Sequence, residues 1–264
     1  MNGKIMRNFY SPLKACDPYL RYVFLTGITK FSQLSIFSEL NNIENISMDE
    51  PYAAIGGISE DEIRSQMKED VEGLAKKLEV TPEEALMKLK ENYDGYHFTY
   101  PSPDIYNPFS LLTAMEKGKI GSYWFGSGTP TYLIKMLDKF GVVPSEIGKK
   151  KAAVEDFDAP TERMTSIIPL LYQSGYITIK DYDEELDLYT LDIPNKEVRI
   201  GLMKSLLPYY VASKAPETNT MVAYLSRDIR NGDIDAALRR LQMFLSTIPP
   251  VSYTHLTLPT NREV

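Results

Sequence analysis

The chain has 264 residues, of which 43% are hydrophobic and 25% are charged, proportions typical of a globular protein with a real core. A net charge of −7 argues against a chain that coats nucleic acid non-specifically, and the single cysteine, Cys16, excludes an internal disulfide. Neither a membrane-length apolar run nor a signal-peptide pattern is present, so the sequence predicts a cytoplasmic protein without a membrane partner.

The first elements predict a sheet. Residues 1–16 have the apolar spacing of a helix, and Asp17-Pro18 ends it. Residues 20–25, which read LRYVFL, are apolar and aromatic and precede Thr26-Gly27. That pattern is typical of a strand buried on both faces, as in a parallel sheet.

Helix-start signals dominate the next hundred residues. Ser59 with Glu62, and Thr81 with the glutamate three residues later, have the spacing of capping boxes. The pairs Asn107-Pro108 and Thr129-Pro130 each place proline in the first turn of an expected helix.

The remaining chain predicts a linker and a second region. Residues 141–163 are polar and unpatterned and are interpreted as a linker between regions 1–140 and 164–249. In the second region, residues 176–182 and 186–193 alternate as in a β-hairpin. Asn195 is expected to cap a helix, and two more helices are expected on either side of Asn231-Gly232.

The last residues, 250–264, show neither helical nor strand periodicity. The codons GTC TCT TAT ACA CAT CTG ACG CTG CCG ACG translate to residues 251–260, and this string resembles a sequencing adapter. We therefore interpret residues 250–264 as a non-native tail and expect the native sequence to differ there.

The sequence contains none of the common catalytic patterns. No G-x-x-x-x-G-K-[ST] loop is present to cradle a triphosphate, and no apolar strand ends in a pair of carboxylates. One cysteine and one histidine outside the tail, His97, are too few for a typical zinc site. His97 lies in an aromatic-rich turn, where a hydrogen-bonded structural role is favoured over Ser-His-Asp catalysis. The sequence therefore assigns no catalytic residue.

Several motifs resemble the bacterial AAA-ATPase-like family in order along residues 9–249. They read FLTGITKFSQLSIFSELNNIENIS, YAAIGGISEDEI, YDGYHF, YNPFSLL, YWFGSGTPTYLIKML and LLYQSGYITIKDYD. Members begin with a P-loop and often end in a restriction-endonuclease-like nuclease domain, and this chain matches only the part between them. The resemblance implies an α/β fold: residues 1–140 would be the C-terminal portion of a P-loop ATPase-like domain with an incomplete parallel sheet. A mostly helical region with a winged-helix-like hairpin would follow.

The resemblance also implies what the chain binds. ATP and Mg²⁺ would be cofactors of the full-length parent and not of this fragment, which is expected to be inactive alone. In the parent, Thr26 and Lys30 would be candidate phosphate-sensing residues. The missing N-terminal half of the same domain would be the partner, so an exposed apolar edge and self-association are expected in isolation.

The other family motif residues permit a structural and a functional interpretation. Asp94, Gly95 and Tyr96 would form either a functional turn or a packing corner with Gly95 at positive φ. Trp124 is interpreted as an anchor, and Thr129 as a helix cap. The alternative function is a nucleic-acid- or protein-binding module that uses the winged-helix-like region. Its basic residues are offset by acidic ones, so DNA binding is not the first expectation.

Overall fold

The structure is a computed structural model that describes residues 8, 10–27, 44–125, 131–142, 146–159, 164–210 and 215–246. The chain divides into two compact units, residues 1–199 and 200–264, and each is described by itself. The elements mix helices with short antiparallel strands, so the general α/β class is confirmed.

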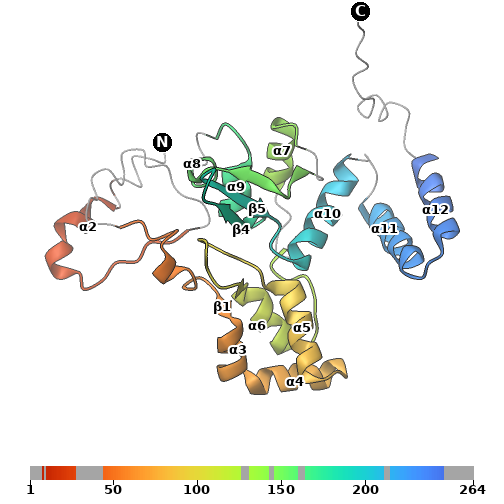
Figure 1. Ribbon diagram of the computed structural model, residues 1–264, viewed down its shortest axis with the longest axis horizontal. Helices are drawn as coiled ribbons and strands as arrows, with labels where there is room; N and C mark the ends of the chain where they lie inside the picture. The colour runs from red at the N-terminus through yellow and green to blue at the C-terminus, as the bar shows by residue number, and fades with distance from the viewer. Residues whose placement is uncertain are drawn as a thin grey trace, which may run out of the picture. The chain divides into compact units, whose positions relative to one another are not determined.

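Four helices of the first unit form a helical lobe (Figure 1). They are α3 (Glu60–Gln66), α4 (Lys68–Leu78), α5 (Pro82–Tyr93) and α6 (Pro108–Lys117). Both predicted capping boxes are confirmed: Ser59 and Thr81 each accept a hydrogen bond from the backbone N–H of the glutamate three residues later. Asn107 caps α6 in the same way through Ser110 N–H. These side chains satisfy backbone donors that a helix start leaves without partners.

The lobe has its own hydrophobic core. Its fully buried side chains come from all four helices and from β2 (Ile105–Tyr106), and include Ile63, Leu74, Leu89, Tyr93, Tyr106 and Leu111. β2 pairs antiparallel with β1 (Ile58–Ser59), which leads directly into α3. This pairing fixes where the chain enters and leaves the lobe.

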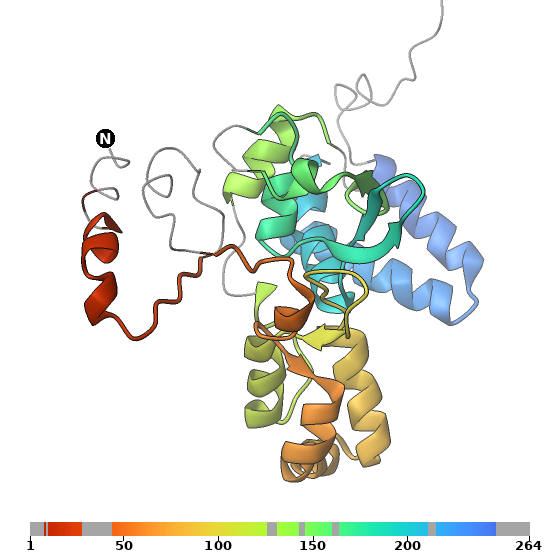
Figure 2. The same cartoon turned by 60° about the vertical axis from the view of Figure 1, so that its left-hand side comes forward.

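A three-stranded antiparallel sheet forms the other part of the first unit. It has the order β3-β5-β4, from β3 (Lys150–Ala152), β4 (Thr178–Asp183) and β5 (Leu188–Asp192). The predicted hairpin is confirmed, and Figure 2 shows β4 and β5 in blue-green. Two short helices, α8 (Val154–Phe157) and α9 (Ile168–Gln173), lie between β3 and β4 in the chain, and α7 (Thr131–Lys139) precedes β3.

The structure differs from the predicted linker at residues 141–163. Lys150–Ala152 pairs with β5 along its whole length, and α8 follows, so part of this interval belongs to the sheet. The boundary between the units falls after Arg199, inside α10 (Lys196–Tyr210). The sequence did not predict β3 because its two lysines suggest a solvated segment. β3 is an edge strand, where charged side chains can reach solvent.

The predicted buried strand at residues 20–25 is wrong. The segment follows two short helices, α2 (Pro12–Ala15) and η1 (Asp17–Tyr19), and has no regular structure. Its side chains are exposed, with Phe24 at 50%. A strand needs a neighbour to complete its hydrogen bonds, and the described strands pair only antiparallel and elsewhere, so the expected parallel sheet does not occur among them.

The second unit contains a helical hairpin, α11 (Ala215–Arg230) and α12 (Ile234–Ser246). Its predicted break at Asn231-Gly232 is confirmed, and Gly232 has a φ of 75°. Asp228 on α11 joins Arg240 on α12 at 2.7 Å. Across the described ranges of both units, no helix is long and apolar enough to cross a membrane.

Candidate functional site

The motif residues Asp94, Gly95 and Tyr96 form a packing corner together with His97, and residues 94–97 are called the corner below. Asp94 ends α5, and Tyr96 makes a bridge to Ile105 that closes the following loop. Gly95 has a φ of 91°, as the sequence predicted. A Cβ at Gly95 would lie 2.6 Å from the carbonyl oxygen of Pro194. The backbone of the corner therefore lies too close to the start of α10 for a side chain.

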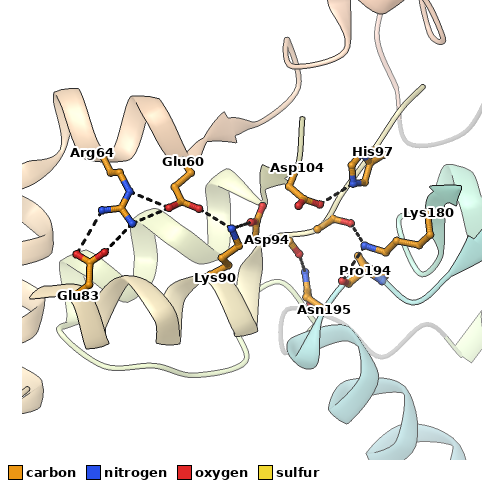
Figure 3. A network of polar contacts seen from close by, with 11 residues as sticks. Glu60, Arg64, Glu83, Lys90, Asp94, His97, Asp104, Lys180, Pro194 and Asn195 are labelled. Atoms are coloured by element: carbon orange, nitrogen blue, oxygen red, sulfur yellow. Dashed lines mark hydrogen bonds and ion pairs between the residues drawn. The ribbon is translucent and has the colours of Figure 1, made fainter. Parts of the chain in front are cut away.

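The corner ties the helical lobe to the three-stranded sheet (Figure 3). Lys180 on β4 donates from Nζ to the carbonyl oxygens of Gly95 and Pro194. Asn195 donates from Nδ2 to the carbonyl oxygen of Asp94 at 3.0 Å, while its Oδ1 caps α10. Burial lowers the pKa of Lys180, because an ammonium loses hydration there. These bonds join segments that lie 85 and 101 residues apart.

Thr178 makes a second tie between β4 and the corner. Its Oγ1 accepts from the backbone N–H of His97 at 2.8 Å and donates to the carbonyl oxygen of His97 at 2.8 Å. The side chain is buried. One hydroxyl thus satisfies both backbone groups of one residue, which leaves little freedom between the two elements.

We predict that Thr178→Val lowers the free energy of unfolding by roughly 1–3 kcal/mol, because valine has the same shape but leaves both His97 backbone groups without this partner. Chemical denaturation measures the change. The control is Thr190→Val on β5 of the same sheet, a half-buried position expected to change stability by less than about 0.5 kcal/mol. Equal effects of the two substitutions would contradict this role of Thr178.

A chain of ion pairs runs across the lobe to the corner (Figure 3). Arg64 bridges Glu83 at 2.9 Å and Glu60 at 2.8 Å, and Glu60 also accepts from Lys90 at 2.7 Å. Hydrogen bonds from Lys90 and then Arg64 lower the pKa of Glu60. Lys90 Nζ lies 4.0 Å from Asp94 Oδ2, so the chain ends at the corner. Its exposed members contribute little stability individually.

Glu197, in the first turn of α10, makes a long-range connection that the sequence did not reveal. Its Oε1 accepts three successive backbone N–H groups, from Tyr123 at 2.5 Å, Trp124 at 2.9 Å and Phe125 at 3.4 Å. The residue is only 4% exposed, and burial raises its pKa. Successive N–H groups that converge in this way form an anion-binding nest. Nothing in the local sequence links positions 123–125 with a glutamate more than 70 residues later.

Trp124 is an anchor, as the sequence predicted. Its ring lies 5.5 Å from that of Tyr176, and the ring of Phe125 lies 5.9 Å from the same tyrosine. Tyr176 lies two residues before the start of β4, so the aromatic cluster holds the loop before α7 next to the sheet. Together with Glu197, this cluster holds the second connection between lobe and sheet.

Both ring nitrogens of His97 make hydrogen bonds within the loop that follows the corner. Its Nε2 lies 2.7 Å from Asp104 Oδ1, and its Nδ1 lies 2.9 Å from Ser102 Oγ. Ser102 Oγ also donates to the carbonyl oxygen of Thr99 at 2.8 Å. The three side chains brace the loop between Tyr96 and Ile105.

Of the two candidate phosphate-sensing residues, the structure describes only Thr26, which makes none of the contacts of this site. Thr26 lies exposed in the irregular segment after residue 20, and Lys30 lies outside the described residues, as do Thr129 and Pro130. Asn107 and Pro108 form the start of α6, as predicted. Among the described side chains, no group of histidine, cysteine and carboxylates has the arrangement of a metal site. The contacts described above tie the helical lobe to the three-stranded sheet within one unit.

The comparisons with known proteins give one relative. No protein-family model matches the chain. No solved structure matches it either. A protein of Azotobacter chroococcum mcd 1, described as an uncharacterized protein in the vnfD 5' region, is 32% identical over 215 residues. This similarity covers 80% of the present chain and 39% of the relative, so the chain spans about two fifths of that protein's length.

Proposed function

We propose that this chain is a non-catalytic part of a larger, AAA-ATPase-like protein, in which it forms an accessory module against the nucleotide-binding half. The observation that carries the proposal is the double connection of the lobe to the sheet, through the corner and through Glu197. The two connections hold the lobe and the sheet together, so they can present one surface to a neighbouring domain. The similarity to only part of a longer relative supports the same proposal.

The exposed segment at residues 20–25 supports a partner for this module. Tyr22 and Phe24 are exposed, and their rings lie parallel with centroids 6.5 Å apart. Side chains two residues apart share a face when the backbone is extended. Neighbouring Val23 is exposed as well, so apolar groups are accessible along the whole segment. In this proposal the missing N-terminal half of the domain covers them, and ATP and Mg²⁺ bind to that half.

We predict that the chain alone neither hydrolyses ATP nor gains thermal stability from ATP with Mg²⁺, because its sequence contains no glycine-rich loop to cradle the phosphates. A thermal-shift series with ATP, with and without Mg²⁺, and a phosphate-release assay measure this. A Mg²⁺-dependent shift of the melting temperature would contradict the proposal. If one appears, Thr26→Ala tests whether the exposed threonine contributes.

The second candidate function is a nucleic-acid- or protein-binding module, and the order of elements favours it. α7, β3, α8, α9, β4 and β5 follow one another with the sheet order β3-β5-β4, a helix-and-hairpin arrangement that resembles a winged helix. The charges favour a protein partner. α9, with the sequence IPLLYQ, contains no basic residue that could contact phosphates. Lys180 on β4 donates to backbone carbonyl oxygens and is therefore already engaged within the protein. Duplex binding that weakens steeply with salt would support nucleic acid instead.

A further inference from the structure

Asp94 holds the junction of lobe and sheet with its backbone. Its carbonyl oxygen accepts from Asn195, and the next carbonyl, that of Gly95, accepts from Lys180. The Asp94 N–H in turn bonds to the carbonyl oxygen of Lys90, the last helical bond of α5. Movement of this one residue would therefore disturb both the end of α5 and the attachment of the sheet.

The side chain of Asp94 is poorly compensated for a buried carboxyl group. The residue is 3% exposed, and Oδ1 has no hydrogen-bond partner within the described part of the chain. Oδ2 lies 4.0 Å from Lys90 Nζ, which makes its short contact with Glu60 instead. The carboxyl group also lies at the C-terminal end of a helix, where the helix dipole disfavours negative charge.

Titratable groups from five segments influence this carboxyl group or are influenced by it. Two of these groups are lysines, Lys90 of α5 and Lys180 of β4. Two are carboxylates, Glu60 of α3 and Asp104 of the loop, and the fifth is the phenol of Tyr106 in β2. A hydrogen bond from the backbone N–H of Gly95 favours the ionised form of Asp94, as do the charges of Lys90 and Lys180, while Asp104 and Glu60 disfavour it. The charges thus oppose one another and leave burial as the dominant influence.

We propose that Asp94 is a proton-dependent clasp: when protonated it keeps the corner closed on the sheet, and when ionised it favours opening of the corner to water. The closed corner is the one described here, with the Asn195 and Lys180 bonds made. Opening would hydrate the carboxylate and break those two bonds together with the neighbouring bonds of the Tyr96 N–H to Ile105 and of the His97 N–H to Thr178, which loosens the helical lobe from the sheet.

The direction of the pH dependence follows from linkage. Burial raises the pKa of Asp94 from 3.8 to about 6 in the closed corner. The closed corner therefore binds the proton more tightly than an open, hydrated one. Closure is most favoured below the ordinary pKa of the carboxyl group, and the advantage is lost as the pH rises through about 6. The ratio of closed to open corner should fall about tenfold between pH 5 and pH 8.

Hydrogen exchange resolved by residue tests the clasp in the full chain. After correction for intrinsic rates, we expect the N–H groups of Tyr96 and His97 to lose about tenfold in protection from pH 5 to pH 8. In Asp94→Asn, which cannot ionise, their protection should not change with pH. The control Asp61→Asn, an exposed carboxylate at the start of α3, should behave like the unchanged protein.

The unchanged protein supplies a second measurement that does not depend on the variant's folding. If N–H groups in the core of the lobe, such as that of Leu74, lose protection in parallel with the corner, the effect is global and the clasp is wrong. Constant protection at the corner between pH 5 and pH 8 would overturn it as well. Loss confined to the corner, and absent in Asp94→Asn, supports it.

Discussion

Gly95→Ala is expected to lower the free energy of unfolding by roughly 2–4 kcal/mol. Gly95 has a φ of 91°, a region that side chains with a Cβ rarely adopt. The added Cβ would also lie 2.6 Å from the carbonyl oxygen of Pro194 and 2.9 Å from Lys180 Nζ. The lysine can move away, but the backbone carbonyl can do so only if the start of α10 shifts. The substitution thus combines backbone strain with loss of the tie to the sheet.

The matched control is another glycine-to-alanine change in the same lobe. Gly73 lies inside α4, and a Cβ there would meet nothing within 4 Å. Gly73→Ala should raise the free energy of unfolding by about 0.5–1 kcal/mol, because alanine is the better helix former. Urea unfolding of both variants gives the comparison. If Gly95→Ala is as stable as Gly73→Ala, the corner is not the rigid joint described here.

Glu197→Ala is the second large effect, with an expected loss of roughly 3 kcal/mol. Three successive backbone N–H groups, those of residues 123–125, would lose their common acceptor in a buried place. Buried donors without partners are costly, and water has little access to replace the carboxylate. The loop that carries Trp124 would also lose its attachment to α10.

Two further variants separate the acceptor from the charge. Glu197→Gln keeps an oxygen that can accept from the three N–H groups, and it removes the carboxyl group whose pKa is raised by burial. It should therefore lower the free energy of unfolding by less than Glu197→Ala does. Glu91→Ala removes an exposed carboxylate of α5 that pairs at 2.8 Å with Lys196, the neighbour of Glu197 in α10, and should change stability by less than about 1 kcal/mol. Thermal unfolding ranks the three, and a Glu91 effect as large as that of Glu197 would contradict the nest.

The local features of this protein could be predicted from the sequence because each depends on residues a few positions apart. The capping residues Ser59 and Thr81, the hairpin of β4 and β5, and the positive φ of Gly95 are of this kind. In each, a side chain satisfies a nearby backbone group, or the absence of a side chain permits a turn. Such signals remain in the sequence whatever surrounds them.

The tertiary structure alone decided the contacts between distant segments. Lys180 and Thr178 meet the corner, and Glu197 meets residues 123–125, across 70 residues or more, which no local pattern encodes. The same reason explains the errors. Residues 20–25 have the composition of a buried strand, but none of the described strands pairs with them, while Lys150–Ala152 looks like a linker and pairs with β5. A strand forms where a second backbone supplies the missing hydrogen bonds, and composition does not say whether that backbone is present.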